Sequence, residues 1–434
     1  MLLTALQNHK EHRKKRVGNL LLAIHPQRIP SANLRFTHTF GLGGMALIIL
    51  LLQVFTGILL RFHYDASPAG AYQSILFIEN DIVFGQLFRN IHHWSGMFLI
   101  VITFLHLLRV FLTGAFLPPR HWNWAIGVVL FLLVVFINFT GYLLPWDQLS
   151  FWAVTVSTSM FDYVPILGEG IKEMIRGGAD VGAETLTIFY TFHTAVLPGL
   201  ITFFLVWHFW KVRKNGGVIL PRNTSETNLK LADSYPHLVN RELITALTLL
   251  AFVLLFSLFF DAPLLEKANP AFSPNPAKSP WYFQGIQELL LHFHPVFAVL
   301  IIPLLLLAGF ILFPFLAYKS QSGNVDFSAK TLNTIILWSA LAGLVITPIL
   351  VLVDEYLLHF QQHTTFLPSW ISEGFFPLLA LTGLTWGFIQ LIKRKFSNKK
   401  IDIVLSLFIL FSVAYIVLML MGTFFRGGGM ELVW

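Results

Sequence analysis

Four histidines occupy two hydrophobic segments of the chain in matched positions. His92 and His106 lie fourteen residues apart, and His193 and His208 lie fifteen residues apart. At a rise of about 1.5 Å per residue, these spacings are about 21 and 22 Å along a helix, and each pair looks out of roughly one side. Antiparallel packing would bring His92 to His193 at one membrane face and His106 to His208 at the other. Each pair could then supply both axial ligands of an iron porphyrin, so the spacing predicts two stacked haems.

The alternative is that each histidine is a polar core residue whose hydrogen bonds are satisfied locally. For a single histidine in an apolar helix this is the commoner case. Ionisable groups inside a membrane are costly, however, and usually functional. Two pairs at nearly equal spacing on similar segments favour the ligand interpretation.

Glycines at the same spacing provide an independent indication. Gly43 and Gly57 are fourteen residues apart in one segment, and so are Gly127 and Gly141 in another. A porphyrin face can approach a helix backbone closely only where no Cβ intervenes. Glycines also serve ordinary helix packing in membranes, but two pairs at the histidine spacing favour haem contacts.

Basic residues flank the histidines where haem propionates would need cations. Arg89 precedes His92 by three residues, and Arg109 follows His106 by three. Lys211 and Arg213 follow His208 in the same way. The alternative for these side chains is ordinary anchoring at the membrane interface.

The composition indicates a polytopic membrane protein. Of 434 residues, 56% are hydrophobic and only 12% are charged, about half the charged fraction of a soluble protein. The chain has no cysteine, which excludes disulfides, cysteine-ligated iron–sulfur clusters and covalent haem on this chain. Its net charge of +7 arises from loops between spans and does not indicate nucleic acid binding.

Hydropathy predicts an all-α bundle of about nine transmembrane helices with a four-helix di-haem core. The expected spans are 38–60, 92–112, 124–144, 188–210, 242–260, 290–317, 332–353, 374–392 and 402–421. We expect a four-span di-haem core over 1–220, a four-span region over 221–395, and an additional span with a tail over 396–434.

The basic residues predict the orientation of the chain. Segments on one side of the membrane carry 22 of the 29 Lys and Arg residues, and the other side carries 7. Positive loops stay in the cytoplasm, so we expect a cytoplasmic N-terminus and a periplasmic C-terminus. The basic run at the N-terminus lacks the apolar core of a signal peptide.

Three further stretches complete a recognisable order: LLQVFTG (51–57), GYLLPWDQ (141–148) and TLTIFYTFHTAVLP (185–198). With the histidine pairs, they resemble the cytochrome b family of quinol:cytochrome c oxidoreductases. The fifteen-residue spacing and Asp147 are most similar to its photosynthetic, plastoquinol-oxidising branch. The resemblance is dense over 33–220, diffuse over 240–355 and absent beyond about 395.

The resemblance implies a bacterial inner-membrane subunit that oxidises quinol at the outer face and reduces a quinone near Arg213. It also implies that 221–395 is a quinone-site region. It implies two non-covalent b-type haems and, as partners, a Rieske-type iron–sulfur protein, a cytochrome c-type subunit, quinone and a second copy in a homodimer. The expected outer quinol site consists of Tyr142, Pro145, Trp146, Pro280, Trp281 and Tyr282.

Two positions depart from the family pattern. Gly41 stands where the photosynthetic branch has the cysteine of a third haem, so we expect that haem to be missing. The family's Pro-Glu-Trp-Tyr motif is Ser279-Pro280-Trp281-Tyr282 here, without its glutamate. Glu288 could accept the quinol proton in its place, or it could be a simple helix N-terminal charge.

Two other functions remain open at this point. A di-haem anchor that links a dehydrogenase to the quinone pool would also use histidine pairs, usually without a proline-rich quinol loop. A transporter could use the histidines to relay protons, but it would contain no haem and would be colourless.

Overall fold

The computed structural model describes residues 27–220, 229–318, 329–358 and 367–433. The basic N-terminal run at 1–16 lies outside these residues. Within the described ranges, nine helical segments are long and apolar enough to cross a membrane, which confirms the expected all-α polytopic bundle. They are Leu42–Arg61, Gly85–Leu112, His121–Leu143, Ala183–Lys214, Ser234–Phe259, Val296–Phe315, Leu332–Leu358, Trp370–Lys395 and Lys400–Phe424.

The front part of the chain runs from a short strand to the fourth span. Its elements are β1 (Arg28–Pro30), η1 (Ser31–Leu34), α2 (Phe36–Thr39), α3 (Leu42–Arg61), α4 (Ala71–Asn80), α5 (Gly85–Leu112), α6 (His121–Leu143), α7 (Gln148–Ser159), η2 (Met160–Tyr163), α8 (Gly168–Arg176), α9 (Ala183–Thr191), η3 (Phe192–Val196) and α10 (Leu197–Lys214). The segment between α6 and α9 therefore contains two helices, α7 and α8, with a break between them.

The back part contains the remaining five spans. Its elements are β2 (Leu231–Asp233), α11 (Ser234–Phe259), η5 (Trp281–Phe283), α12 (Gln284–His292), η6 (Val296–Ile301), α13 (Ile302–Tyr318), α14 (Ala329–Val353), η7 (Asp354–Leu358), η8 (Trp370–Phe375), α15 (Phe376–Lys395), α16 (Lys400–Phe424) and η9 (Gly428–Met430). Strand β2 pairs antiparallel with β1.

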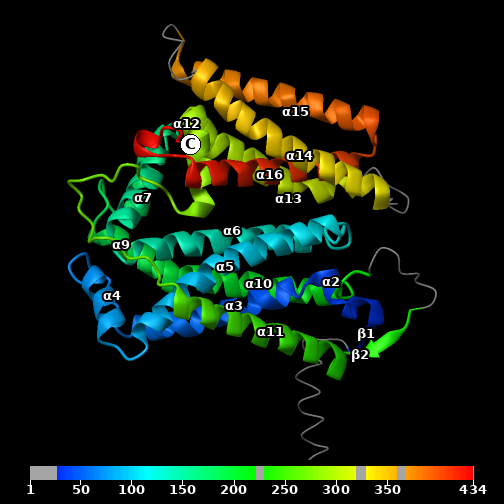
Figure 1. The fold of residues 1–434 in the computed structure, drawn as a ribbon, viewed down its shortest axis with the longest axis horizontal. Coiled ribbons are helices and arrows are strands. Elements are labelled where there is room, and N and C mark those ends of the chain that lie inside the picture. The colour runs from blue at the N-terminus through cyan, green and yellow to red at the C-terminus, as the bar shows by residue number, and fades with distance from the viewer. Residues whose placement is uncertain (1–26, 221–228, 319–328, 359–366, 434) are drawn as a thin grey trace, which may run out of the picture. The chain divides into compact units, whose positions relative to one another are not determined.

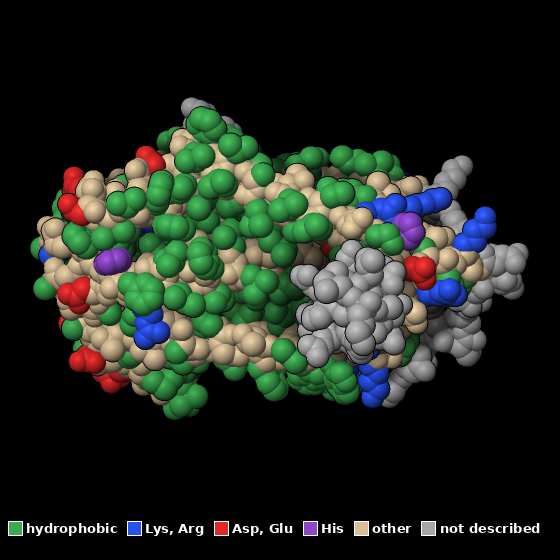
Figure 2. All heavy atoms as spheres, turned by 90° about the horizontal axis from the view of Figure 1, so that it is seen from below, with side chains coloured by type: hydrophobic (Ala, Val, Ile, Leu, Met, Phe, Trp, Pro, Cys, Tyr) green, Lys and Arg blue, Asp and Glu red, His purple; other side chains and the backbone are tan. Residues whose placement is uncertain are grey.

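Helix α11 illustrates why these helices face lipid. Large apolar side chains along its length are exposed, among them Leu243, Leu247, Leu254 and Leu258. Figure 2 shows hydrophobic side chains over a broad continuous area of one face. Exposed apolar surface on this scale is unfavourable in water and favourable in a bilayer.

The chain divides into two compact units, each built from separated segments. Unit 1 comprises 1–59, 87–127 and 203–262, and unit 2 comprises 60–86, 128–202 and 263–434. The division passes through α3, α5, α6 and α10. In unit 1, α3, α5 and α11 run side by side (Figure 1).

The ninth span, α16, is an integral part of unit 2. It packs against both α14 and α12, and it lies among the helices of this unit in Figure 1. A Cβ added at Gly343 of α14 would lie 2.9 Å from the carbonyl oxygen of Leu410 and 3.0 Å from Val413. The close approach of α14 and α16 therefore depends on a glycine.

This contact predicts the effect of a larger side chain. Gly343→Leu should lower the thermal unfolding midpoint of the detergent-purified protein, because overpacking costs about 1–3 kcal/mol. Gly383→Leu on α15 is the matched control, since a Cβ at Gly383 meets nothing within 4 Å. Equal midpoints for the two variants would contradict this packing.

Candidate functional site

The inner histidine pair lies together within unit 1. The ring centroids of His106 on α5 and His208 on α10 are 6.5 Å apart, with the ring planes at 73°. A metal–imidazole bond is about 2 Å long, and a ring nitrogen lies about 1 Å from its centroid. The ring centroids of two imidazoles that bind one metal atom from opposite sides are therefore about 6 Å apart. The predicted pairing of His106 with His208 fits a bis-imidazole haem.

The outer histidines belong to different units, and each is held by its own hydrogen bonds. His92 Nδ1 lies 2.9 Å from Thr56 Oγ1, and the Thr56 hydroxyl donates to the Leu52 carbonyl at 2.8 Å. The Thr56 oxygen therefore accepts from the imidazole Nδ1–H. In that tautomer the lone pair is on Nε2, the nitrogen suited to a metal ligand.

His193 in unit 2 has the same arrangement on a different helix. Its Nδ1–H donates to the Ile137 carbonyl at 2.9 Å, and the Thr140 hydroxyl lies 3.4 Å away. His193 also sits in η3, a π-helical turn between α9 and α10. Such turns often occur at functional sites, and this one sets the direction of the imidazole.

The four predicted glycines each lie against one of the four histidines. A Cβ at Gly43 would be 3.2 Å from His106, and one at Gly57 would be 3.1 Å from His92. The corresponding distances are 3.7 Å from Gly127 to His208 and 2.5 Å from Gly141 to His193. A Cβ at Gly141 would clash with His193, and one at Gly43 or Gly57 would press tightly against its histidine. In unit 1, Gly43, Gly127, His106 and His208 together form a cradle that suits the two faces of one haem.

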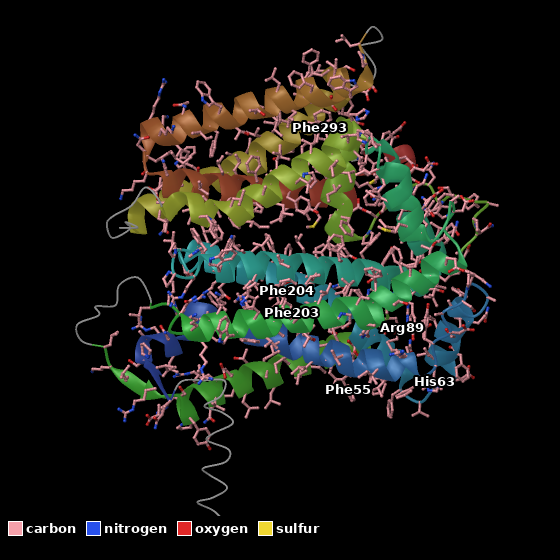
Figure 3. All side chains as sticks on the ribbon, turned by 180° about the vertical axis from the view of Figure 1, so that it is seen from behind. Phe55, His63, Arg89, Phe203, Phe204 and Phe293 are labelled. Carbon is pink, nitrogen blue, oxygen red and sulfur yellow. The ribbon has the colours of Figure 1, made fainter. Side chains whose placement is uncertain are left out.

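The predicted propionate partners differ in their surroundings. Arg89 is buried and donates to the Ala262 carbonyl at 2.8 Å; Figure 3 labels it on α5. Arg109 donates to the His38 carbonyl at 3.0 Å. Arg213 is exposed near the end of α10. Arg89 and Arg109 are thus held in place by backbone carbonyls, while the Arg213 side chain reaches solvent.

Gly41 has a backbone conformation that suits glycine. Its φ is +66°, in the left-handed region, and an added Cβ would lie 3.1 Å from the Thr245 methyl group. A side chain here would be strained and crowded. This geometry agrees with the absence of a cysteine at this position.

The two predicted quinol motifs lie side by side in unit 2. Ala268 N donates to the Trp146 carbonyl at 3.1 Å, and Gln148 N donates to the Glu266 carbonyl at 2.8 Å. The rings of Phe139 and Phe283 are 5.2 Å apart. Burial, and then the charge of Tyr142, raise the pKa of Tyr282. The end of α6 and the Ser279–Phe283 turn therefore form one local site.

Two features of this site are typical of a place where a ligand binds. Trp146 has a φ of +53°, a strained conformation for a bulky residue. Among the residues that the structure describes, no partner is found for the buried hydroxyls of Ser279 and Tyr282. Buried polar atoms are normally hydrogen-bonded, so these hydroxyls could bind the oxygen atoms of a ligand.

Glu288 is not a helix N-terminal charge, because the first turn of α12 contains no acidic residue. It is fully buried, and Arg426 Nη2 donates to its Oε1 at 2.6 Å. His292, Asp354 and Glu355 complete a cluster around this pair. Sequence reasoning did not identify these four partners, although ionisable residues at the ends of apolar spans could have indicated them.

Comparison with known proteins connects this geometry to one family. The Cytochrome b/b6/petB family model matches residues 29–216. The cytochrome b6 of Heliobacterium modesticaldum is 39% identical over 209 residues, which cover 48% of this chain and 97% of that protein. The cytochrome b6 of Porphyra purpurea is 46% identical over 175 residues, covering 40% and 81% of the respective chains.

A solved structure extends the likeness beyond the front half. A chain of a hyperthermophilic respiratory Complex III has a TM-score of 0.66 and covers 95% of this chain and 98% of its own length. At 21% identity, this likeness shows the fold alone. The His106–His208 pair and the near full-length match to cytochrome b6 lead to one conclusion: the chain belongs to the cytochrome b/b6 family of b-haem-binding membrane proteins.

Proposed function

We propose that this chain is the di-haem cytochrome b subunit of a bacterial complex that oxidises quinol at the outer membrane face and reduces quinone at the inner face. The observation that carries the proposal is the His106–His208 pair at 6.5 Å. His92 and His193 are the proposed ligands of the outer haem. When bound, the haems would carry single electrons across the membrane.

The residues of the chain have distinct roles in this proposal. Thr56 and the Ile137 carbonyl hold the outer histidines in the tautomer that exposes Nε2 to the metal. Tyr142, Pro145, Trp146, Pro280, Trp281 and Tyr282 line the outer quinol site, where the Tyr282 hydroxyl binds a quinol oxygen. Arg213 is the proposed cationic residue at the inner quinone site. The proposed partners in the complex are a Rieske-type iron–sulfur protein, which accepts one electron from quinol, and a cytochrome c-type subunit. The complex is proposed to be a homodimer.

The paired motifs favour this function over a di-haem dehydrogenase anchor. In such an anchor nothing would require the Trp146 turn to pack on the loop that leads to Ser279–Phe283. The buried hydroxyls of Ser279 and Tyr282 support a ligand with hydrogen-bonding oxygens at this point. A transporter is disfavoured by the match to cytochrome b6.

Two non-covalent b-type haems per chain are expected in the purified complex. Pyridine haemochrome analysis should give two haems, both extractable into acidified acetone, because the chain has no cysteine. His193→Ala should remove the outer, lower-potential haem and His208→Ala the inner one, as seen in reduced-minus-oxidised spectra. One haem per chain, or haem retained on the polypeptide, would be incompatible with the proposal.

Adjacent glycines on α3 allow a matched test of the haem cradle. Gly43→Val should abolish the inner haem signal, because its side chain enters the space beside His106. Gly44→Val should retain both haems, since an added Cβ there meets nothing within 4 Å. Haem content is measured per polypeptide. Retention of both haems in Gly43→Val would exclude the cradle.

The expected orientation can be tested because the chain has no native cysteine. Ala271→Cys and Asn398→Cys place single thiols at exposed positions on opposite sides of the proposed topology. A membrane-impermeant maleimide should label Ala271→Cys in intact spheroplasts and label Asn398→Cys only after permeabilisation. The reverse pattern would invert the proposed orientation.

A further inference from the structure

A buried ionic cluster joins three parts of unit 2 that are far apart in sequence. Glu288 and His292 lie on α12, Asp354 and Glu355 begin η7 at the end of α14, and Arg426 follows α16. Because the start of the sixth span and the ends of the seventh and ninth lie on one side of the membrane, chain topology also brings them together. In the proposed orientation this is the outer side.

The cluster is connected by short contacts. His292 Nδ1 lies 2.6 Å from Asp354 Oδ2, and His292 Nε2 lies 3.5 Å from Glu288 Oε1. Arg426 donates to Glu288 at 2.6 Å through Nη2 and to both Glu355 oxygens at 3.1 Å through Nη1. Glu288, His292 and Asp354 thus form a continuous chain of oxygen and nitrogen atoms that can accept and donate protons.

Exposure increases along this chain. The side chain of Glu288 is 0% exposed, that of His292 is 8% and that of Asp354 is 14%. Glu355, which shares Arg426 with Glu288, is 26% exposed. A proton that entered at Glu288 would therefore move toward solvent at each transfer.

The charges of the cluster leave room for a proton. Three carboxylates face one arginine, so the cluster carries a negative excess even when His292 is protonated. Burial by itself would lower the pKa of His292, but hydrogen bonds and charges from Asp354 and Glu288 raise it. Burial would likewise raise the pKa of Glu288, but hydrogen bonds from His292 and Arg426 and their charges lower it.

The ninth span also holds the neighbouring quinol motif. Tyr415 of α16 donates to the Tyr282 carbonyl at 2.6 Å, and a Cβ at Gly285 would lie 2.7 Å from the Tyr415 ring. Lys278 donates to the Thr423 carbonyl at 2.9 Å. Glu288 follows Tyr282 by six residues, about 9 Å of helical rise, which one water molecule and the glutamate side chain can largely bridge.

We propose that Glu288, His292 and Asp354 form a proton outlet that replaces the missing motif glutamate, with Arg426 as a positioning residue supplied by the ninth span. This inference rests on the proposed quinol-oxidising function. The quinol O–H bond breaks as Glu288 gains the proton, and Glu288 passes it to neutral His292 at Nε2. His292 gives its Nδ1 proton to Asp354, which releases it to water. The relay moves protons only.

The relay predicts a pH dependence with a defined sign. It requires neutral His292 and ionised Glu288, so quinol oxidation should slow as the pH falls and His292 becomes protonated. Asp354→Asn removes the carboxylate that raises the pKa of His292. The fall in rate on the acid side of the pH–rate profile (the acid limb) should therefore move to lower pH. Arg426→Gln removes a cation that lowers the pKa of Glu288 and opposes protonation of His292, and should move the limb to higher pH.

The experiment measures haem reduction by stopped flow in membranes that contain the whole complex. Reduced decylubiquinone and reduced menadione are used in parallel from pH 5.5 to 9, with ferricyanide as oxidant. Glu288→Gln should slow the reaction at least tenfold while both haem spectra remain. The other two variants should shift the limb in opposite directions by about one pH unit each.

Asp402→Asn is the matched control. Asp402 is a buried carboxylate on α16, bonded to Ser397 and outside the cluster, and its loss should leave the pH profile unchanged. Unshifted profiles in Asp354→Asn and Arg426→Gln, or near-wild-type rates in Glu288→Gln, would overturn the relay. If Arg426→Gln lost its haems, Asp354→Asn and Glu288→Gln would decide the question. If the wild-type complex with both haems failed to react with either quinol, the proposed function itself would fail, and the relay with it.

Discussion

Every polar atom that lies inside an apolar helix bundle needs a partner, and this requirement organises both candidate sites. An imidazole buried among leucines and phenylalanines loses its hydrogen bonds to water, which is costly unless they are replaced. The Nδ1–H of His92 donates a hydrogen bond to Thr56 Oγ1, and the Nδ1–H of His193 donates one to the Ile137 carbonyl. A metal is the natural partner for the Nε2 lone pair in such a site. The local hydrogen bond therefore directs the chemistry of each ring.

The same requirement explains the ionic cluster of unit 2. A buried glutamate alone would be strongly destabilising, and removing one partner of a buried ion pair typically costs about 3–5 kcal/mol. Arg426 contacts Glu288 through two nitrogens and holds Glu355 as well. The ninth span thus does more than add a helix, because Arg426 at its far end pairs with the two carboxylates of Glu288 and Glu355.

Periodicity made much of the site predictable. Histidines and glycines repeated every fourteen or fifteen residues must lie on one side of a helix, so their alignment follows from helix geometry. The structure places His106 with His208 and each glycine against a histidine. Spans follow in the same way from long apolar runs, because a bilayer admits few other structures. The π-helical turn at His193 and the break between α7 and α8 have no such periodic signal.

The sequence by itself determined the membrane class, the nine spans and the four histidines, because hydropathy and helical spacing are local properties of the chain. Contacts between distant segments were decided only on folding. Thr56 becomes the partner of His92, thirty-six residues away, and Arg426 becomes the partner of Glu288, 138 residues away. A lone arginine near the C-terminus resembles any interfacial anchor in the sequence. Its role depends on which buried carboxylates α16 meets when it packs against α12 and α14, and that packing is a property of the tertiary structure.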